Sequence, residues 1–221
     1  MTGLSLSRGG RPAAISCGRS TMETAAYWVA QATLLGFPAA LTFWFIIHPF
    51  TQRWRRLGPV KTYLAVIAVL ILLELLLFLF SEPLLRIHFG VSLPLAAIAL
   101  FLFLTSVYLG ILLLKHLTPA ILFGLPQLSR TRSPGKLLTQ GIYSRIRHPR
   151  YLQGGIALTS LALFTNYLVV YLILALYIPL IYLIVLLEER ELLARFGQKY
   201  QEYSRRVPRF IPRLLPPRSS R

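Results

Sequence analysis

The chain has 221 residues, of which 55% are hydrophobic, and its mean hydropathy is +0.61. A soluble domain of this composition would lack the polar surface needed to cover its core. Several apolar runs are long enough to cross a bilayer, which predicts an all-α, polytopic integral membrane protein. The net charge of +17 would suggest nucleic acid in a soluble protein. Here the cations flank the apolar runs, so we expect anionic lipid headgroups and no nucleic acid as partners.

Cysteine and histidine are too sparse to predict a metal centre. Cys17 is the only cysteine, and the four histidines have no ligand spacing, so neither an internal disulfide nor a bound metal is expected. Residues 1–24 are rich in Gly, Ser and Arg and predict a disordered N-terminal tail. Met22 stands directly before the first apolar run and is an alternative start of translation. Nothing in the sequence reveals the oligomeric state.

About five apolar segments are predicted to span the membrane, three of them within residues 25–116. Their approximate ranges are 25–50, 60–80, 91–114, 151–165 and 167–187. Asn166 predicts a tight helical hairpin between the last two segments, and Pro179 predicts a kink in the fifth. Glu74 lies inside the second segment, where a carboxyl group is costly. A protonated or hydrogen-bonded packing role for it is favoured over a functional one.

The segments that leave the membrane have a different composition. Residues 117–140 combine apolar side chains with five prolines and glycines, which predicts a segment lying at the interface. Glu188 opens a predicted aqueous helix with one apolar face. On that helix Glu191 and Arg195 have the spacing of an ordinary surface ion pair. Residues 213–221 form a basic tail.

Lysine and arginine are distributed unevenly over the loops. Four follow the first segment, one the second, seven the third, none the fourth and nine the fifth. The positive-inside rule therefore predicts that the first loop, the third loop and the C-terminus are cytoplasmic. The basic stretch at residues 141–151 and the Glu188-Glu189 pair are thus predicted to lie on the same, cytoplasmic side.

That basic stretch, Gly141-Ile-Tyr-Ser-Arg-Ile-Arg-His-Pro-Arg-Tyr151, is the most informative run in the chain. Its arginines and His148 form an anion-binding surface at a membrane boundary, although basic residues before a span often only determine topology. Pro149 removes a helical donor and favours an extended His148. Gly154 and Gly155 allow a flat ligand or a neighbouring helix to approach the backbone closely.

Glu188 and Glu189 stand where the last segment leaves the membrane, and the predicted hairpin folds this exit back against His148. A pocket there would combine carboxylates, a guanidinium and an imidazole with the rings of Tyr143 and Tyr151. This mixture suits a zwitterionic ligand that carries an aromatic base and a sugar.

The Arg-His-Pro-x-Tyr motif at residues 147–151, followed by the distant Glu188-Glu189 pair, resembles the isoprenylcysteine carboxyl methyltransferase family. That family is related to the phospholipid N-methyltransferases through a shared C-terminal core. The resemblance covers residues 135–212, so the methyltransferase core is predicted at residues 117–212, as an interfacial segment, a helical hairpin and a cytoplasmic helix. It implies a membrane enzyme that uses S-adenosyl-L-methionine (SAM) without a Rossmann fold. The chain has no glycine-rich strand-to-helix fingerprint.

The resemblance also implies which residues form the cofactor pocket and the catalytic centre. The implied cofactor-binding residues are Gly135, Lys136, Leu137, Leu138, Tyr143, His148, Pro149, Arg150, Tyr151 and Glu188. The implied catalytic residues are Arg147, His148 and Glu189. The eukaryotic prenylcysteine enzymes carry an arginine one turn before the glutamate pair, where this chain has Ile184. A prenylcysteine carboxylate would therefore lack its expected counter-ion.

The implied reaction is SAM-dependent methyl transfer to a lipid-like substrate. Carboxyl O-methylation of an isoprenylcysteine-type or other lipidic acid is the first expectation, and N-methylation of a phosphatidylethanolamine-type phospholipid is the alternative. Displacement at a sulfonium methyl needs chiefly alignment of the reacting atoms. A carboxylate acceptor needs no base, whereas an amine acceptor would lose a proton to Glu188, Glu189 or His148.

Two other interpretations compete. Membrane sterol reductases have a similar C-terminal core and bind NADPH, but the Arg-Tyr-Leu-Gln-Gly run and the glutamate pair of this chain favour SAM. A non-catalytic protein that only organises anionic lipid would explain the basic loops. It would leave the His148-Pro149 motif and the glutamate pair unexplained.

Overall fold

The computed structural model describes residues 21–115 and 137–212. This part of the chain is built from helices, with one isolated bridge between His88 and Tyr167. In chain order the helices are α1 (Thr21–Ile47), α2 (Thr51–Leu57), α3 (Pro59–Leu79), α4 (Ser81–Leu84), α5 (Leu93–Leu114), the short 3-10 helix η1 (Gly141–Ser144), α8 (Pro149–Thr165), α9 (Leu168–Phe196) and α10 (Gln198–Arg206). The prediction of an all-α fold is confirmed.

Four of these helices, α1, α3, α5 and α9, are long and apolar enough to cross a membrane. The shortest of the four has 21 residues, and at about 1.5 Å per residue it matches the roughly 30 Å of a hydrocarbon core. The prediction of a multi-pass integral membrane protein is thus confirmed. Helix α8 has 17 residues, or about 26 Å, so a fifth span stays a prediction.

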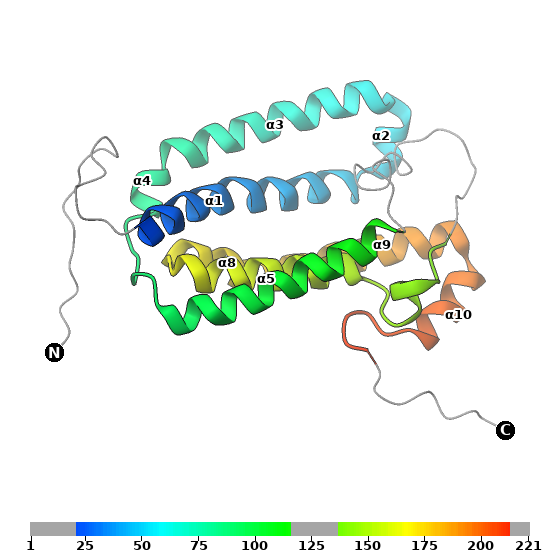
Figure 1. Ribbon diagram of the computed structural model, residues 1–221. Helices are drawn as coiled ribbons and strands as arrows, with labels where there is room; N and C mark the ends of the chain where they lie inside the picture. The colour runs from blue at the N-terminus through cyan, green and yellow to red at the C-terminus, as the bar shows by residue number, and fades with distance from the viewer. Residues whose placement is uncertain (1–20, 116–136, 213–221) are drawn as a thin grey trace.

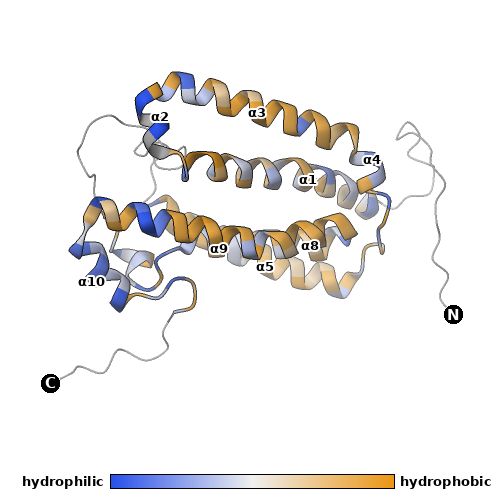
Figure 2. Ribbon diagram, turned by 180° about the vertical axis from the view of Figure 1, so that it is seen from behind, coloured by the Kyte–Doolittle hydropathy of each residue, from blue (hydrophilic) through white to orange (hydrophobic). Residues whose placement is uncertain are grey.

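The long helices lie side by side and alternate in direction (Figure 1). Helices α2, η1 and α10 gather at one end of the bundle, and α4 and the turn between α8 and α9 lie at the other. Apolar residues dominate the middle of the helices, whereas polar residues concentrate near α2 and α10 (Figure 2). The described parts of the first loop, the third loop and the C-terminal region therefore share one end, which agrees with the predicted topology. Assignment of that end to the cytoplasm stays a prediction.

Helix α8 lies at the centre of the packing, with α5, α9 and α1 against it, while α3 packs mainly against α1. Small and branched residues such as Ala30, Leu158, Ala162 and Val170 are almost fully buried where these helices meet. The outer faces of α3 and α5 expose large apolar side chains, as expected of surfaces that face lipid. Glu74 of α3 makes no hydrogen bond or ion pair with any residue that the structure describes, so its role stays a prediction.

Asn166 forms the predicted tight hairpin. It ends α8 in the left-handed region, with φ 55° and ψ 36°, which asparagine tolerates better than most residues. Its side-chain amide donates to the carbonyl oxygen of Gly90 at 2.7 Å and accepts from the Tyr171 hydroxyl at 3.0 Å. The first bond anchors the hairpin to the segment before α5, and the second is internal to the hairpin. The start of α8 and the end of α9 therefore lie at the same end of the bundle (Figure 1).

Two predicted boundaries differ from the structure. Helix α1 begins at Thr21 and not after residue 24, because Glu23 in its first turn stabilises the helix N-terminus. Helix α9 does not stop at Glu188 but continues to Phe196, since neither proline nor glycine stands between Glu188 and Gly197. Gly197, with φ 54°, ends α9 and begins α10. Three predicted segments lie outside the described residues: the rest of the N-terminal tail (1–20), the segment 116–136 and the basic tail 213–221.

Candidate functional site

The stretch before α8 is fixed by backbone bonds to the segment that follows α10. The backbone N–H of Arg147 donates to the carbonyl oxygen of Pro208 at 2.8 Å, and that of His148 donates to Arg209 at 3.0 Å. Pro149 then occupies the first turn of α8, where its missing N–H costs nothing. His148 is consequently held as the residue that caps α8, with φ −121° and ψ 55°.

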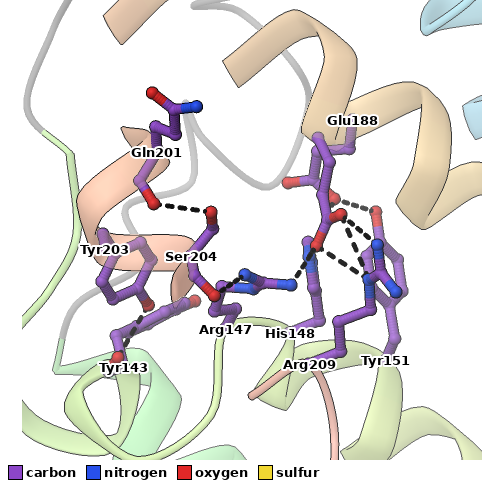
Figure 3. A network of polar contacts seen from close by, with 10 residues as sticks. Tyr143, Arg147, His148, Tyr151, Glu188, Gln201, Tyr203, Ser204 and Arg209 are labelled. Atoms are coloured by element: carbon purple, nitrogen blue, oxygen red, sulfur yellow. Dashed lines mark hydrogen bonds and ion pairs between the residues drawn. The ribbon is translucent and has the colours of Figure 1, made fainter. Parts of the chain in front are cut away.

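His148 lies between the two carboxylates of the glutamate pair. Its Nε2 is 3.1 Å from an oxygen of Glu189, and its Nδ1 is 3.6 Å from an oxygen of Glu188. The Tyr151 hydroxyl donates to Glu188 at 2.9 Å. Figure 3 shows the side chains of His148 and Tyr151, from the start of α8, lying close to Glu188 of α9. The two halves of the motif, about 40 residues apart in sequence, therefore meet at one end of the bundle.

The environment of His148 favours its protonated form. Burial lowers the pKa of the imidazole, but hydrogen bonds to Glu188 and Glu189 and the charges of both carboxylates raise it. The net effect places the pKa of His148 above its ordinary value of 6.5. Protonation of His148 is therefore favoured relative to a free imidazole.

Glu189 is bound by two guanidinium groups as well. Arg147 approaches it at 2.9 Å, and Arg209 contacts both of its oxygens, at 2.8 to 3.1 Å. Arg147 also donates to the backbone carbonyl of Ser204 on α10. The bond to Glu189 raises the pKa of Arg209 above its ordinary range. Glu189 thus ties α9 to the stretch before α8 and to the segment after α10.

Tyr143 is buried beside this cluster, and its backbone carbonyl accepts a hydrogen bond from the Tyr203 hydroxyl at 2.7 Å. Burial and the nearby charge of Glu188 raise the pKa of the Tyr143 phenol. Leu137 packs against Tyr203 and its neighbours, whereas Leu138 packs beside Tyr143. The predicted cofactor residues Gly135 and Lys136 lie outside the described residues.

Arg150 packs its guanidinium group against α1. Its guanidinium carbon lies 4.5 Å from the centre of the Trp44 ring, and Trp44 stacks on His48 with ring centres 5.0 Å apart. His48 Nδ1 is 3.4 Å from a carboxylate oxygen of Glu191. Helix α1, predicted only as a span, therefore contributes to the same end of the molecule as the motif.

Trp44, His48 and Arg209 were not predicted as site residues. An aromatic side chain near the end of a span has an ordinary interfacial interpretation, and Arg209 is one of many arginines near the C-terminus. The only local signal was the position of His48 at the end of a span, next to a basic loop. None of these residues is marked by spacing, since the contact between His48 and Glu191 joins positions 143 residues apart.

Gly154 and Gly155 are approached by a neighbouring helix. A Cβ atom added at Gly154 would lie 2.7 Å from the Tyr177 hydroxyl, and one at Gly155 would lie 3.4 Å from the Tyr177 ring. The Tyr177 hydroxyl donates to the backbone carbonyl of Tyr151 at 2.8 Å. Of the two predicted neighbours of these glycines, a ligand or a helix, the structure identifies α9.

The hydrogen-bond acceptors of this site fit a ligand with cationic and hydroxyl groups. Glu188 receives one hydrogen bond from Tyr151 and keeps 27% of its side chain exposed, whereas the Glu189 side chain is 13% exposed. A carboxylate has about four acceptor positions, so Glu188 retains capacity for an ammonium group or ribose hydroxyls. Within residues 21–115 and 137–212, no group of His, Cys, Asp and Glu side chains is placed to hold a metal ion.

Comparisons with known proteins agree with the motif. Residues 94–199 match the model of a family described as phospholipid methyltransferase, which confirms the resemblance to the related carboxyl methyltransferases. The nickel-cobalt-cadmium resistance protein NccN of Alcaligenes xylosoxydans xylosoxydans is 37% identical over 83 residues, 38% of this chain and 39% of that protein. The cobalt-zinc-cadmium resistance protein CzcN of Cupriavidus metallidurans is 39% identical over 83 residues, 38% of each chain. The chain thus aligns with less than half the length of these relatives, and no solved structure matches it.

Proposed function

We propose that this chain, whose residues 94–199 match the model of the phospholipid methyltransferase family, transfers a methyl group from SAM to a lipid-like acceptor. The observation that carries the proposal is the contact of His148 with both Glu188 and Glu189. An imidazole and a paired carboxylate at the end of a membrane bundle suit a polar cofactor that meets an acceptor held in the bilayer. We further propose that this end of the bundle is cytoplasmic, since the basic loops gather there.

SAM, when bound, supplies a methyl group that is already activated on a positively charged sulfur. Glu188 would accept hydrogen bonds from its ammonium or ribose hydroxyls, with Tyr151 orienting the carboxylate. Tyr143 and Leu138 would provide apolar surface for the adenine ring. Arg150, packed on Trp44 and therefore restrained, would face its carboxylate.

The other motif residues would act as positioning groups. Glu189 binds Arg147 and Arg209, so we assign it and Arg147 to holding His148 against Glu188 and not to contact with the acceptor. A protonated His148 would bridge the two carboxylates, which it contacts with its two ring nitrogens. For an amine acceptor, the proton released on methylation would go to Glu188, because its carboxylate is the more exposed of the pair.

The acceptor class has two candidates. Carboxyl O-methylation of an isoprenylcysteine-type or other lipidic acid is the first, and it needs no base. N-methylation of a phospholipid amine is the second, and it is favoured by the description of the matching family. Ile184, which replaces the arginine of the prenylcysteine enzymes, is fully buried in α9 and offers no counter-ion to an acid. The metal-resistance role in the relatives' names is not carried over, because they match over 83 residues only.

The acceptor class can be tested with membranes that contain the protein and methyl-labelled SAM. Label that mild base releases as methanol is an ester and supports carboxyl methylation. Base-stable label that extracts with phospholipid supports N-methylation. Absence of transferred label from membranes whose protein binds SAM would contradict both acceptor assignments.

The cofactor assignment has its own experiment. The purified chain should be stabilised against heat by SAM or its demethylated product and not by NADPH, because ligands stabilise the state that binds them. Glu188→Gln and His148→Ala should each lose this stabilisation while remaining folded in detergent. Glu202→Gln is the matched control, since Glu202 is an exposed carboxylate on α10. Normal SAM affinity in both site variants would overturn the assignment, and stabilisation by NADPH alone would favour a reductase.

A further inference from the structure

A cavity of about 430 Å³ lies where α9, α10 and the segment after α10 meet. It includes Glu189 and Arg147, but none of His148, Tyr151 and Glu188 lines it. Its size is within the range of small-ligand sites. The cavity therefore adjoins the candidate methyl-transfer site through one shared ion pair without being part of it.

The walls of this cavity are positively charged. Arg147, Arg190 and Arg209 line it, against a single carboxylate, that of Glu189. Glu189 is already bound by Arg147 and Arg209, and Arg190 makes no ion pair or hydrogen bond with a described residue. Three guanidinium groups around one carboxylate leave a net positive site that suits an oxyanion such as a phosphate.

Two buried donors in the same walls have no acceptor among the described residues. Tyr200 lines the cavity and is 4% exposed, and its hydroxyl makes no hydrogen bond with a described residue. The Nε of Arg147 is likewise buried and makes no hydrogen bond with a described residue. A buried polar group without a partner costs about 1–3 kcal/mol. A ligand that carries several acceptor oxygens would satisfy such groups.

The position of the cavity along α9 corresponds to the level of lipid headgroups. About 20 residues from Leu168 cover the roughly 30 Å of a hydrocarbon core. Leu186, Arg190 and Leu193, which line the cavity, lie at or just beyond the end of that length. An anion bound there would be at the depth of phospholipid phosphates.

An exposed apolar stripe leads from the hydrocarbon into the cavity. The side chains of α9 that enter it recur every three to four residues, as on one face of a helix. The same face continues toward the middle of the bundle through Tyr182, Leu183, Leu176 and Leu172, all of them exposed. Arg209 lies 5.8 Å from the Tyr182 ring and so connects the stripe to the charged walls. A free phosphate would make no use of this stripe, but acyl chains would cover it.

We propose that this cavity binds the phosphate of an anionic phospholipid whose acyl chains lie along the exposed face of α9. The guanidinium groups of Arg190 and Arg209 and the Tyr200 hydroxyl would bind the phosphate oxygens. This proposal does not depend on methyl transfer. The basic loops in general predict contact with anionic lipid, and the proposal assigns that contact to one location.

The test uses the full chain in detergent and measures added phosphatidylglycerol by native mass spectrometry and by thermal stabilisation. Phosphatidylcholine and inorganic phosphate are the comparison probes. We expect tight binding of one phosphatidylglycerol molecule, weakened at least tenfold by Arg190→Gln and by Tyr200→Phe. Lys199→Gln removes an equal charge from the exposed surface of α10 outside the cavity and should leave the affinity unchanged.

Three outcomes would overturn the proposal. Equal weakening by Lys199→Gln and Arg190→Gln would indicate general surface attraction. Stabilisation by inorganic phosphate equal to that by phosphatidylglycerol would indicate a simple anion site without a lipid. Unchanged affinity in Arg190→Gln and Tyr200→Phe, with both variants as stable as the parent chain without lipid, would place the lipid elsewhere.

Discussion

Glu188 and Glu189 are neighbours on one helix, yet their surroundings differ. Glu188 receives a hydrogen bond from the Tyr151 hydroxyl and lies 3.6 Å from His148. Glu189 is held by Arg147, by Arg209 and by the opposite nitrogen of the same imidazole. Successive residues of an α-helix point about 100° apart, so a pair of identical residues faces two different partner sets.

The comparison shows how one motif can provide both binding capacity and rigidity. A carboxylate between two guanidinium groups has its charge balanced and its acceptor positions filled. A carboxylate bound by a phenol and one imidazole keeps negative charge and free acceptor positions for a cationic ligand. Glu188 is therefore the side of the pair that we expect to contact a ligand, and Glu189 the side that holds three segments together.

The largest expected effect on stability comes from removing the ion pairs of Glu189 with Arg147 and Arg209. Glu189→Gln leaves Arg147, whose side chain is 8% exposed, without its anionic partner. Removing one member of a buried pair costs about 3–5 kcal/mol. Denaturant unfolding in detergent should show a loss approaching that size, whereas Glu188→Gln should cost about 1 kcal/mol, as for one ordinary hydrogen bond. Equal losses in the two variants would contradict the division of roles.

The second prediction concerns Tyr177, which holds the backbone of Tyr151, the residue whose hydroxyl donates to Glu188. Gly154→Ala would bring a methyl group to 2.7 Å from the Tyr177 hydroxyl, which holds the backbone of Tyr151. Overpacking of this kind costs about 1–3 kcal/mol. Gly155→Ala is the matched control, because its methyl group would make an ordinary contact at 3.4 Å.

A double variant separates this clash from other effects of Gly154→Ala. Tyr177→Phe removes the hydroxyl that the new methyl group would meet. Adding it to Gly154→Ala should recover part of the lost stability, although Tyr177→Phe alone destabilises the protein by about 1 kcal/mol. Strictly additive losses in thermal unfolding would show that the close approach is not the cause.

The third prediction tests the contribution of α1. Trp44→Leu removes the ring that restrains Arg150, a contact worth about 0.5–2 kcal/mol. SAM affinity, measured where the variant is fully folded, should fall about 2- to 30-fold. Because Trp44 is buried in the core, its truncation should also lower the unfolding temperature. Trp28→Leu, an equal truncation at an exposed position of the same helix, should leave SAM affinity unchanged. An equal loss of SAM affinity in both variants would mean that α1 affects the site only through the packing of the helix bundle.

The smallest expected effect is a pH dependence from His148. Because its pKa is raised in the folded protein, the stability that it contributes is fully present below its unfolded value of about 6.5. That contribution is lost as the pH rises through the folded-state pKa. The unfolding temperature should therefore be lower at pH 9 than at pH 6. His148→Gln should make the unfolding temperature less dependent on pH. A variant with the parent profile would contradict it.

Much of the architecture follows from local patterns. Apolar runs of about 20 residues predicted α1, α3, α5 and α9, because backbone groups in hydrocarbon must be paired within a helix. Asn166 predicted the hairpin because the left-handed region admits few other residues. The uneven distribution of Lys and Arg predicted that the His148 stretch and the glutamate pair share one end.

The partners of those residues were decided by tertiary structure. Arg209 binds Glu189 only because the chain after α10 runs back along the stretch before α8. Trp44 meets Arg150 because α1 packs against both α8 and α9. Such contacts have no periodicity in the sequence, since they depend on how whole helices pack and not on neighbours a few residues away. Sequence alone therefore predicted the four long apolar helices and the motif that lies at one end of them. Packing determined which of two adjacent carboxylates keeps free acceptor positions.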